Sequence, residues 1–349
     1  MQTLHLDVET ITPLFIAGAD QSHIEGEGLR SPTLRGLMRW WFRSIIGGMA
    51  DEETLKEKES EIFGSPEARS KVRVLTNTID GKPVRIDGIN ALKELGYFWF
   101  SIRMQSRDQR PFCYPPGSKF SITLMSDDSD ALRIAASTLW ATIYLGGVGA
   151  RMRRGAGALR VLKAEDGSYC NFSFRGSNIV PDAKVFLEKN LKAILENFKK
   201  KYEILRKPNG EPPFCILSKK TAEIVLIDKP FVRYEDGLRE ISDVYQHYRS
   251  GRDRFGRKIA RGILREERAV FGLPIQRLHE REKLRHASPL FVGVMKLDGT
   301  YVIRLVKFYT SVHPYFVGKS RFVRQHLDSL DDQLNSRFPE IQIEIPEVS

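Results

Sequence analysis

The sequence predicts an α+β protein made of two tandem, related domains. Three observations lead to this prediction. Segments patterned as strands and as helices alternate along the chain, a short motif occurs once in each half, and 349 residues exceed the usual size of a single domain. The repeated motif is Ile62-Phe63-Gly64-Ser65-Pro66, which resembles Val270-Phe271-Gly272-Leu273-Pro274.

In the first half, alternating apolar and polar residues predict strands, and apolar residues at helical spacing predict helices. In chain order we expect a strand at 4–10, a helix from Ser31-Pro32 to Gly47-Gly48, a charged helix at 51–61, strands at 70–75, 96–102 and 119–124, a helix at 131–145 and a strand at 159–162. This order is that of a split βαβ, ferredoxin-like arrangement. Two helices then cover one face of an antiparallel sheet, and the other face is left free for a ligand.

The second half continues with the same kinds of element. We expect a long helix at 183–202, strand-like residues at 214–227, a helix at 241–249, paired strands at 290–294 and 301–308, a helix at 320–334 and a strand at 341–345. We place the domain junction near the long helix. The predicted domains are therefore 1–175, ferredoxin-like with a glycine-rich loop, and 176–349, ferredoxin-like with helical insertions.

The charge balance favours an anionic partner. Lys and Arg number 55 against 44 Asp and Glu, which gives a net charge of +11 and a pI near 9.5, and nucleic acid is the commonest partner of such a chain. The three cysteines lie far apart, so we expect no disulfide framework, no metal site and no cofactor. With neither a signal peptide nor a membrane-spanning run, the sequence predicts a cytoplasmic protein.

The most distinctive stretch is residues 146–158, which hold five glycines and three arginines. Glycines permit positive φ and close approach of the backbone to a ligand, exposed N–H groups can form an anion site, and guanidinium groups match phosphate oxygens. The stretch lacks the Gly-Lys-Ser/Thr ending of a nucleotide-binding P-loop. We therefore predict that it binds the backbone of a polyanion, through Gly147, Gly149, Arg151, Arg153, Arg154, Gly155 and Gly157. The alternative is a tight helix-to-strand connection with solvated arginines.

Further basic residues extend the predicted RNA-binding surface. Arg35, Arg39 and Arg43 recur along one face of the helix that begins at Ser31, and no acidic residue occurs from Leu29 to Met49. Arg30 precedes this helix, and Lys71 lies on the next strand. Arg252, Arg254 and Arg257 belong to a basic stretch, 249–268, that we include on charge alone. For each group the alternative is an ordinary solvated face.

The first 165 residues resemble the family of the first subunit of the Cmr complex, a type III-B CRISPR effector of the RAMP superfamily. The resemblance lies in residues 12–19 and 29–43, in Glu61-Ile62-Phe63-Gly64-Ser65 and in the loop at 146–157; beyond them it rests on Phe271-Gly272-Leu273-Pro274 and on length. It implies tandem ferredoxin-like (RNA-recognition-motif-like) domains. It also implies a non-cutting subunit that joins other Cmr subunits and binds guide RNA, or its duplex with target RNA, near the guide 3′ end.

Two other functions stay open at this stage. A metal-independent endoribonuclease of the same superfamily needs a general acid or base, for which His23 is the candidate, with Tyr114 and Lys71 as possible assistants. A purely structural subunit would instead meet acidic protein partners with its basic faces. Assays of RNA cleavage and RNA binding distinguish these functions.

Overall fold

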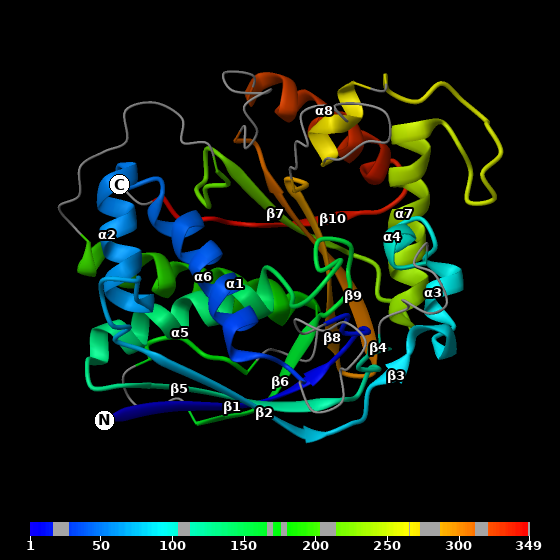
Figure 1. The fold of residues 1–349 in the computed structure, drawn as a ribbon. Helices are drawn as coiled ribbons and strands as arrows, with labels where there is room; N and C mark the ends of the chain where they lie inside the picture. The colour runs from blue at the N-terminus through cyan, green and yellow to red at the C-terminus, as the bar shows by residue number, and fades with distance from the viewer. Residues whose placement is uncertain are drawn as a thin grey trace.

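The computed structural model describes residues 1–16, 28–103, 112–165, 170–175, 180–202, 214–264, 266–272, 287–310 and 320–347. Within these ranges the chain forms two four-stranded antiparallel sheets with helices packed against them (Figure 1). The predicted α+β class is confirmed.

The N-terminal sheet contains the strands β1 (Gln2–Thr10), β2 (Arg73–Asp80), β5 (Lys119–Ser126) and β6 (Leu159–Glu165). They lie in the order β2-β5-β1-β6, and each neighbouring pair is antiparallel. The helices α1 (Ser31–Ile46) and α5 (Ser129–Tyr144) cover one face of this sheet (Figure 1). Leu4, Leu6 and Val8 of β1 are buried under them because strand side chains alternate between the two faces.

The C-terminal sheet has the same connectivity. Its strands β7 (Ala222–Ile227), β8 (Leu290–Leu297), β9 (Thr300–Phe308) and β10 (Glu340–Ile343) lie in the antiparallel order β10-β7-β9-β8. In both sheets the third strand lies between the first two, and the fourth lies beside the first. The helix α7 (Tyr234–Ser250) follows β7, and α8 (Ser320–Asn335) precedes β10.

The remaining elements are additions to this repeated unit. Two are long helices, α2 (Glu52–Phe63) and α6 (Val180–Lys201). The short helices are α3 (Ala91–Glu94), α4 (Phe100–Arg103) and the 3₁₀ helices η1 (Ile86–Gly88) and η3 (Glu267–Phe271). The two-stranded sheet consists of β3 (Val84–Arg85) and β4 (Phe112–Cys113). The repeated motif has one role in both halves. Gly64 ends α2 and Gly272 ends η3, each at positive φ before the second strand of its sheet.

One predicted strand is wrong. Residues 96–102 form helical turns that lead into α4. In a strand, buried and exposed side chains would alternate along this aromatic run, and here they do not. Instead the adjacent residues Phe98 and Trp99 are both buried; Phe98 packs against Tyr245 of α7, and Trp99 against Phe15.

The hydrophobic core is shared between the two halves of the chain. Phe291 of β8 and Phe308 of β9 lie in one core cluster with α1 and β1, while Phe15 and Trp99 lie in the other with α7 and β8. The ring of Phe291 is 5.3 Å from that of Trp40 on α1. A boundary at 175 therefore runs through a continuous apolar interior, and the independence of the domains 1–175 and 176–349 stays a prediction.

We expect the described core to unfold as one unit. Phe291→Ala removes a fully buried ring that contacts both halves. It should lower the free energy of unfolding by about 3–5 kcal/mol and lower the temperature of a single calorimetric transition. The control is Phe100→Ala, at a ring that is 53% exposed, which should stay within about 0.5 kcal/mol of wild type. Two separate transitions, in either protein, would contradict a shared core.

Candidate nucleic-acid interface

Residues 146–158, here called the glycine–arginine loop, lie between the two halves of the molecule. The loop connects α5 to β6 and runs beside the outer edge of β8. The amide of Val292 donates to the carbonyl of Arg153 at 3.2 Å, and Arg154 and Val292 form a parallel bridge. On its other side, Ala150 bridges Phe15. The loop therefore belongs to the packing of both sheets.

Several loop amides are not free to form the predicted anion site. The amides of Val148, Ala150 and Gly157 donate to the carbonyls of Gly157, Phe15 and Pro13 at 2.7–2.9 Å, and those of Arg154 and Ala156 bond the carbonyl of Arg151. These N–H groups are already satisfied within the protein, so they offer a ligand nothing.

The glycines of the loop serve close packing. Gly147, Gly155 and Gly157 are buried, and Gly155 and Gly157 have positive φ. A β-carbon at Gly155 would overlap Leu238 of α7, and one at Gly157 would overlap the carbonyl of Val148. These three buried glycines are therefore not placed to approach a ligand. Gly149, by contrast, is partly exposed.

Arg154 is a buried link between the halves, and its contact with RNA stays a prediction. Its guanidinium group donates to the carbonyl of Leu290 at 3.0 Å and to the hydroxyl of Tyr245 at 2.7 Å, and it lies 4.8 Å from the centre of the Tyr245 ring. The indole of Trp99 donates to the carbonyl of Arg154. Its guanidinium group is therefore engaged within the protein.

Arg151 and Arg153 are more accessible. Arg153 stacks over the rings of Phe291 and Trp40, at 4.2 and 5.2 Å from their centres, and donates to the carbonyl of Ser288. Arg151 donates to the hydroxyl of Ser101 at 2.8 Å and adopts φ of +62°, a left-handed conformation rare for a residue with a side chain. Both side chains face a cleft.

The arginine–aromatic cleft is a cavity of about 730 Å³ between the glycine–arginine loop, α4, α7 and η3. It is lined by Tyr97, Phe98, Phe100, Ser101, Arg151, Met152, Arg153, Arg154, Tyr245, Arg249, Phe271, Gly272, Ala287 and Ser288. Four of these residues are arginines, five are aromatic, and none is acidic. Arg249 bonds the hydroxyl of Tyr97 at 3.3 Å and stacks on Tyr245.

Positive charge in the cleft has no carboxylate partner among the lining residues that the structure describes. Burial lowers the pKa of Arg151 and Arg154, with the neighbouring arginine charge adding to the effect on Arg151, and burial lowers the pKa of Arg153 to about 10. All three stay protonated near neutral pH. An anion in the cleft would offset the cost of holding these charges together.

Two of the predicted arginines on α1 share one carboxylate instead. Arg39 Nε lies 2.6 Å from Glu59 Oε1, and Arg43 Nη1 lies 3.2 Å from Glu59 Oε2. Glu59 is buried on α2, so these pairs fix α2 against α1. The sequence showed no acid within α1, but the acid comes from the next helix. Among the described residues Arg35 has no such pair, and its buried Nε lacks a hydrogen-bond partner there.

Lys71 is also neutralised. Its ammonium group lies 2.7 Å from Glu61 and 3.2 Å from Asp128, and the hydrogen bond to Glu61 raises the pKa of Lys71. It therefore joins α2 to the start of α5. Arg30 is the residue before α1, where its carbonyl accepts from the amide of Leu34. A role for Arg30 in RNA binding stays a prediction.

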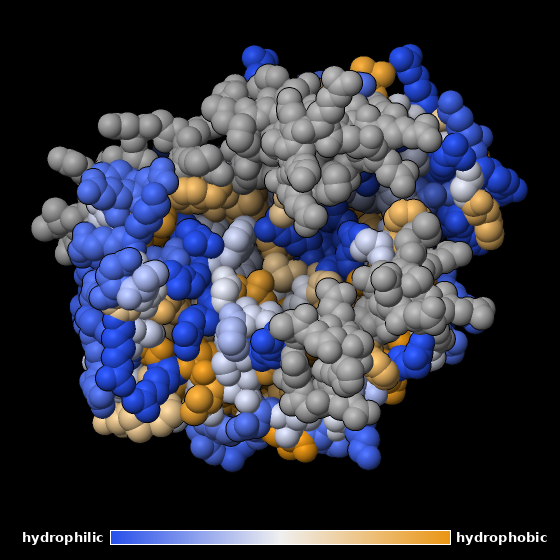
Figure 2. All heavy atoms as spheres, in the orientation of Figure 1, coloured by the Kyte–Doolittle hydropathy of each residue, from blue (hydrophilic) through white to orange (hydrophobic). Residues whose placement is uncertain are grey.

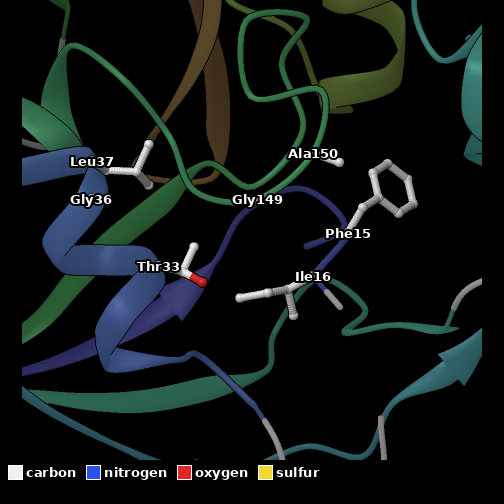
Figure 3. Close-up of a pocket in the computed structure, with 7 residues that line it drawn as sticks. All are labelled: Phe15, Ile16, Thr33, Gly36, Leu37, Gly149 and Ala150. Carbon is white, nitrogen blue, oxygen red and sulfur yellow. The ribbon is translucent and has the colours of Figure 1, made fainter. Parts of the chain in front are cut away.

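A second, smaller pocket lies on the other side of the loop. Figure 3 shows its lining, in which Thr33, Gly36 and Leu37 of α1 face Phe15, Ile16, Gly149 and Ala150. Its volume is about 300 Å³. The described lining residues have no ionisable side chain, so they supply no charge for binding a phosphate. It borders Gly149, the one predicted loop glycine that is partly exposed.

The face of the N-terminal sheet opposite its helices is a poor stacking surface. His5, Asp7 and Glu9 of β1 point to this face, where Glu9 pairs with Arg160 at 2.9 Å and His5 with Asp7 at 3.3 Å. In the described strands this face carries no aromatic side chain. The ligand surface expected there is less suited to RNA than the arginine–aromatic cleft.

The remaining predicted residues lie elsewhere. Arg252, Arg254 and Arg257 are exposed in residues 251–264, which project beyond the C-terminal end of α7 (Figure 1). His23 lies outside the described residues. Within the described ranges no group of three or more His, Cys, Asp or Glu could hold a metal ion.

Sequence reasoning missed the aromatic wall of the cleft. Tyr245 and Phe271 come from the second half of the chain and meet the loop only through tertiary packing. Tyr245 has helical apolar spacing, which predicts a core residue. The repeated motif could have identified Phe271, since it places this residue next to Gly272, a glycine with positive φ.

Comparison with known proteins defines the class. The RAMP superfamily matches residues 7–160, and the Cmr1-like C-terminal family matches residues 238–344. The CRISPR system Cmr subunit Cmr1-1 of Pyrococcus furiosus is 31% identical over 328 residues, which cover 89% of each chain. Cmr1-2 of the same organism is 41% identical over 176 residues, 44% of this chain and 92% of the relative. The chain belongs to the Cmr1 family.

Solved structures agree in fold. The apo form of Cmr1 from Pyrococcus furiosus superposes with a TM-score of 0.71 at 27% identity, over 98% of this chain and 99% of that one. A chain of type III-B Cmr-beta, bound to cognate target RNA and AMPPnP in the presence of ssDNA, has a TM-score of 0.60 at 15% identity, over 94% and 98% of the two chains. The latter likeness shows the fold alone. In the described part of the chain, no helix is both long and apolar enough to cross a bilayer.

Arg154 and Arg151 should differ sharply in their effect on stability. Arg154→Ala leaves the Tyr245 hydroxyl and the Leu290 carbonyl without their partner, and it should cost about 2–4 kcal/mol in urea unfolding. Arg151→Ala removes a bond to an exposed serine and should cost less than about 0.5 kcal/mol. Equal costs would contradict the buried role of Arg154.

Proposed function

We propose that this protein is an RNA-contacting subunit of a type III-B Cmr effector complex and that the arginine–aromatic cleft is its RNA site. The RNA is the guide, or the guide–target duplex near the guide 3′ end, as the family resemblance implies. Membership in such a complex is supported by the 31% identity to a Cmr subunit across most of the chain. The observation that carries the RNA site is the cluster of arginines in the cleft, whose described lining residues include no acid.

The cleft combines the two kinds of contact that bind single-stranded RNA. Guanidinium groups match phosphate oxygens, and aromatic rings stack on bases. Arg151 is partly exposed at the cleft, and Phe100 beside it keeps 53% of its surface open. Arg153 and Arg249 are each held over aromatic rings, which orients their charge before RNA arrives. Neither contact reads the base sequence, so binding should tolerate many sequences.

The proposed RNA site is narrower than the sequence alone indicated. Arg151 and Arg153 remain from the glycine–arginine loop, and Arg249, Phe100 and Tyr97 join them from α7 and from residues 97–100. Arg35 on α1, and Arg30 just before it, extend the proposed path. The paired side chains Arg39, Arg43 and Lys71 are left out, because an RNA phosphate would have to compete with a carboxylate for each of them.

Charge and stacking should be separable by mutation. Arg151→Ala should weaken binding to single-stranded RNA and reduce the slope of log K against log salt by up to about 0.7 for each lost phosphate contact. Phe100→Ala should weaken binding by about 1–3 kcal/mol and leave the salt slope unchanged. Filter binding at several salt concentrations measures both effects.

Lys56→Ala is the control for net charge, because it also removes one positive charge but lies on α2, paired with Glu52. It should change neither the affinity nor the slope. If Arg151→Ala leaves the slope at its wild-type value, the cleft is not the RNA site.

The proposed subunit does not cut RNA. A labelled guide RNA incubated with the purified chain should stay intact on denaturing gels, with or without EDTA, and His23→Ala should change nothing. A catalysed cleavage would need a general acid or base placed against the RNA. Cleavage that persists in EDTA and is lost in His23→Ala would establish the endoribonuclease function instead.

A further inference from the structure

Residues 251–264, here called the finger, form a compact loop between α7 and η3. The finger begins at Gly251, which ends α7 in a left-handed conformation. The amide of Asp253 donates to the carbonyl of Arg257 at 2.9 Å, and Gly256 has φ of +82°. One carboxylate oxygen of Asp253 accepts from the amides of Phe255 and Arg257, both at 2.9 Å. This bonding is that of a tight hairpin turn closed by a glycine.

The base of the finger is tied to α7. Gln246 donates from its side chain to the carbonyl of Asp253 at 2.9 Å, and the amide of Ile259 donates to the carbonyl of Gly251 at 2.8 Å. Gly262 packs on the backbone of Ser250 and Gly251, where a β-carbon would be too close. The tip is therefore presented in one conformation, which lowers the entropy that a partner must remove on binding.

Large apolar side chains project from this ordered loop into solvent. Phe255 is 69% exposed, Ile259 is 59% exposed and Leu264 is 53% exposed. Figure 2 shows apolar side chains among hydrophilic ones on the projection at the right edge of the molecule, where Figure 1 draws these residues in yellow. Large apolar side chains that are exposed on an ordered loop mark a candidate interaction surface.

The charge around these side chains is predominantly positive. The finger carries five basic residues and a single acidic one, a net charge of +4. The acid, Asp253, is occupied by Arg257 at 2.7 Å. Arg254 lies with its guanidinium carbon 4.8 Å from the centre of the Phe255 ring. A partner must therefore offer negative charge around an apolar centre.

We propose that the finger docks another protein, through a surface of that partner that is acidic and holds an apolar pocket for Phe255. Arg and Phe are enriched in protein interfaces, and a central buried aromatic group with a charged rim is their usual arrangement. Complementary charge then directs the approach of the two proteins.

The apolar composition favours a protein over RNA as the occupant. Ile259 and Leu264 have no π face on which a base could stack. The Phe255 ring is already flanked by two guanidinium groups, since Arg257 lies 5.3 Å from its centre. RNA would leave the aliphatic side chains in water, whereas a protein pocket removes them from it.

The inference rests on the proposed membership in a Cmr complex, and the test uses that assembly. The probe is the complex reconstituted from the remaining Cmr subunits and guide RNA of the same organism. The variant Phe255→Ser/Ile259→Ser should lower the affinity of this chain for the assembly at least about tenfold, while binding of single-stranded RNA by the chain alone stays within twofold of wild type.

The matched control is Val185→Ser, because Val185 is also an apolar side chain, 62% exposed, but lies on α6. It should join the assembly with wild-type affinity. A second variant, Arg254→Glu, should also weaken joining, with an effect that shrinks as salt rises. Both finger side chains are exposed, so the melting temperature of the variants should match that of wild type.

Wild-type affinity of the double variant for the assembly overturns the inference and leaves the proposed function intact. Loss of RNA binding by the isolated double variant, with joining unchanged, also overturns it and makes the finger an RNA element. If the wild-type chain itself does not join the assembly, the proposed membership fails, and the inference fails with it. Weaker joining with unchanged RNA binding supports the inference.

Discussion

Two buried arginines, one from each half of the chain, hold the two sheets in one arrangement. Arg154 donates from the glycine–arginine loop to Leu290 and Tyr245 in the second half, and Arg304 of β9 donates to the carbonyls of Tyr144 and Gly146 at the end of α5 in the first. The last carbonyls of a helix have no partner inside it, so Arg304 supplies one. A buried guanidinium group without acceptors is costly, and each arginine therefore depends on the position of the opposite half. Gly293 makes this possible, because any side chain there would overlap the Arg304 guanidinium.

The arginine–aromatic cleft follows from that arrangement. Its walls come from both halves, and the same loop that contributes Arg154 to the interior contributes Arg151 and Arg153 to the cavity. The positive charge there is balanced by ring faces, hydroxyls and carbonyls, which stabilise a cation without neutralising it. The paired arginines of α1 show the contrast, since both contact the carboxylate of Glu59, which commits them to the packing of α2.

Periodicity along the chain was enough to predict most elements, because strands and helices impose their own spacing on apolar residues. It failed at residues 96–102, where Phe98 and Trp99 are buried by contacts with distant segments rather than by a sheet. The glycine–arginine loop was located from its composition, but composition does not show which groups are already bonded. The acid that neutralises Arg39 and the tyrosine that holds Arg154 are 20 and 91 residues away in sequence, so only the fold brings them together.

The course of the glycine–arginine loop beside β8 limits how the protein can join others. The outer edge of that strand is partly occupied by the bond from Val292 to Arg153, so a strand from another chain cannot pair there to enlarge the sheet. The loop cannot itself serve as a template for pairing, because Gly149, Arg151, Gly155 and Gly157 all have positive φ. An unprotected strand edge invites uncontrolled polymerisation, and a segment of this shape terminates the ladder. Contacts with neighbours on this side of the molecule must therefore be made by side chains.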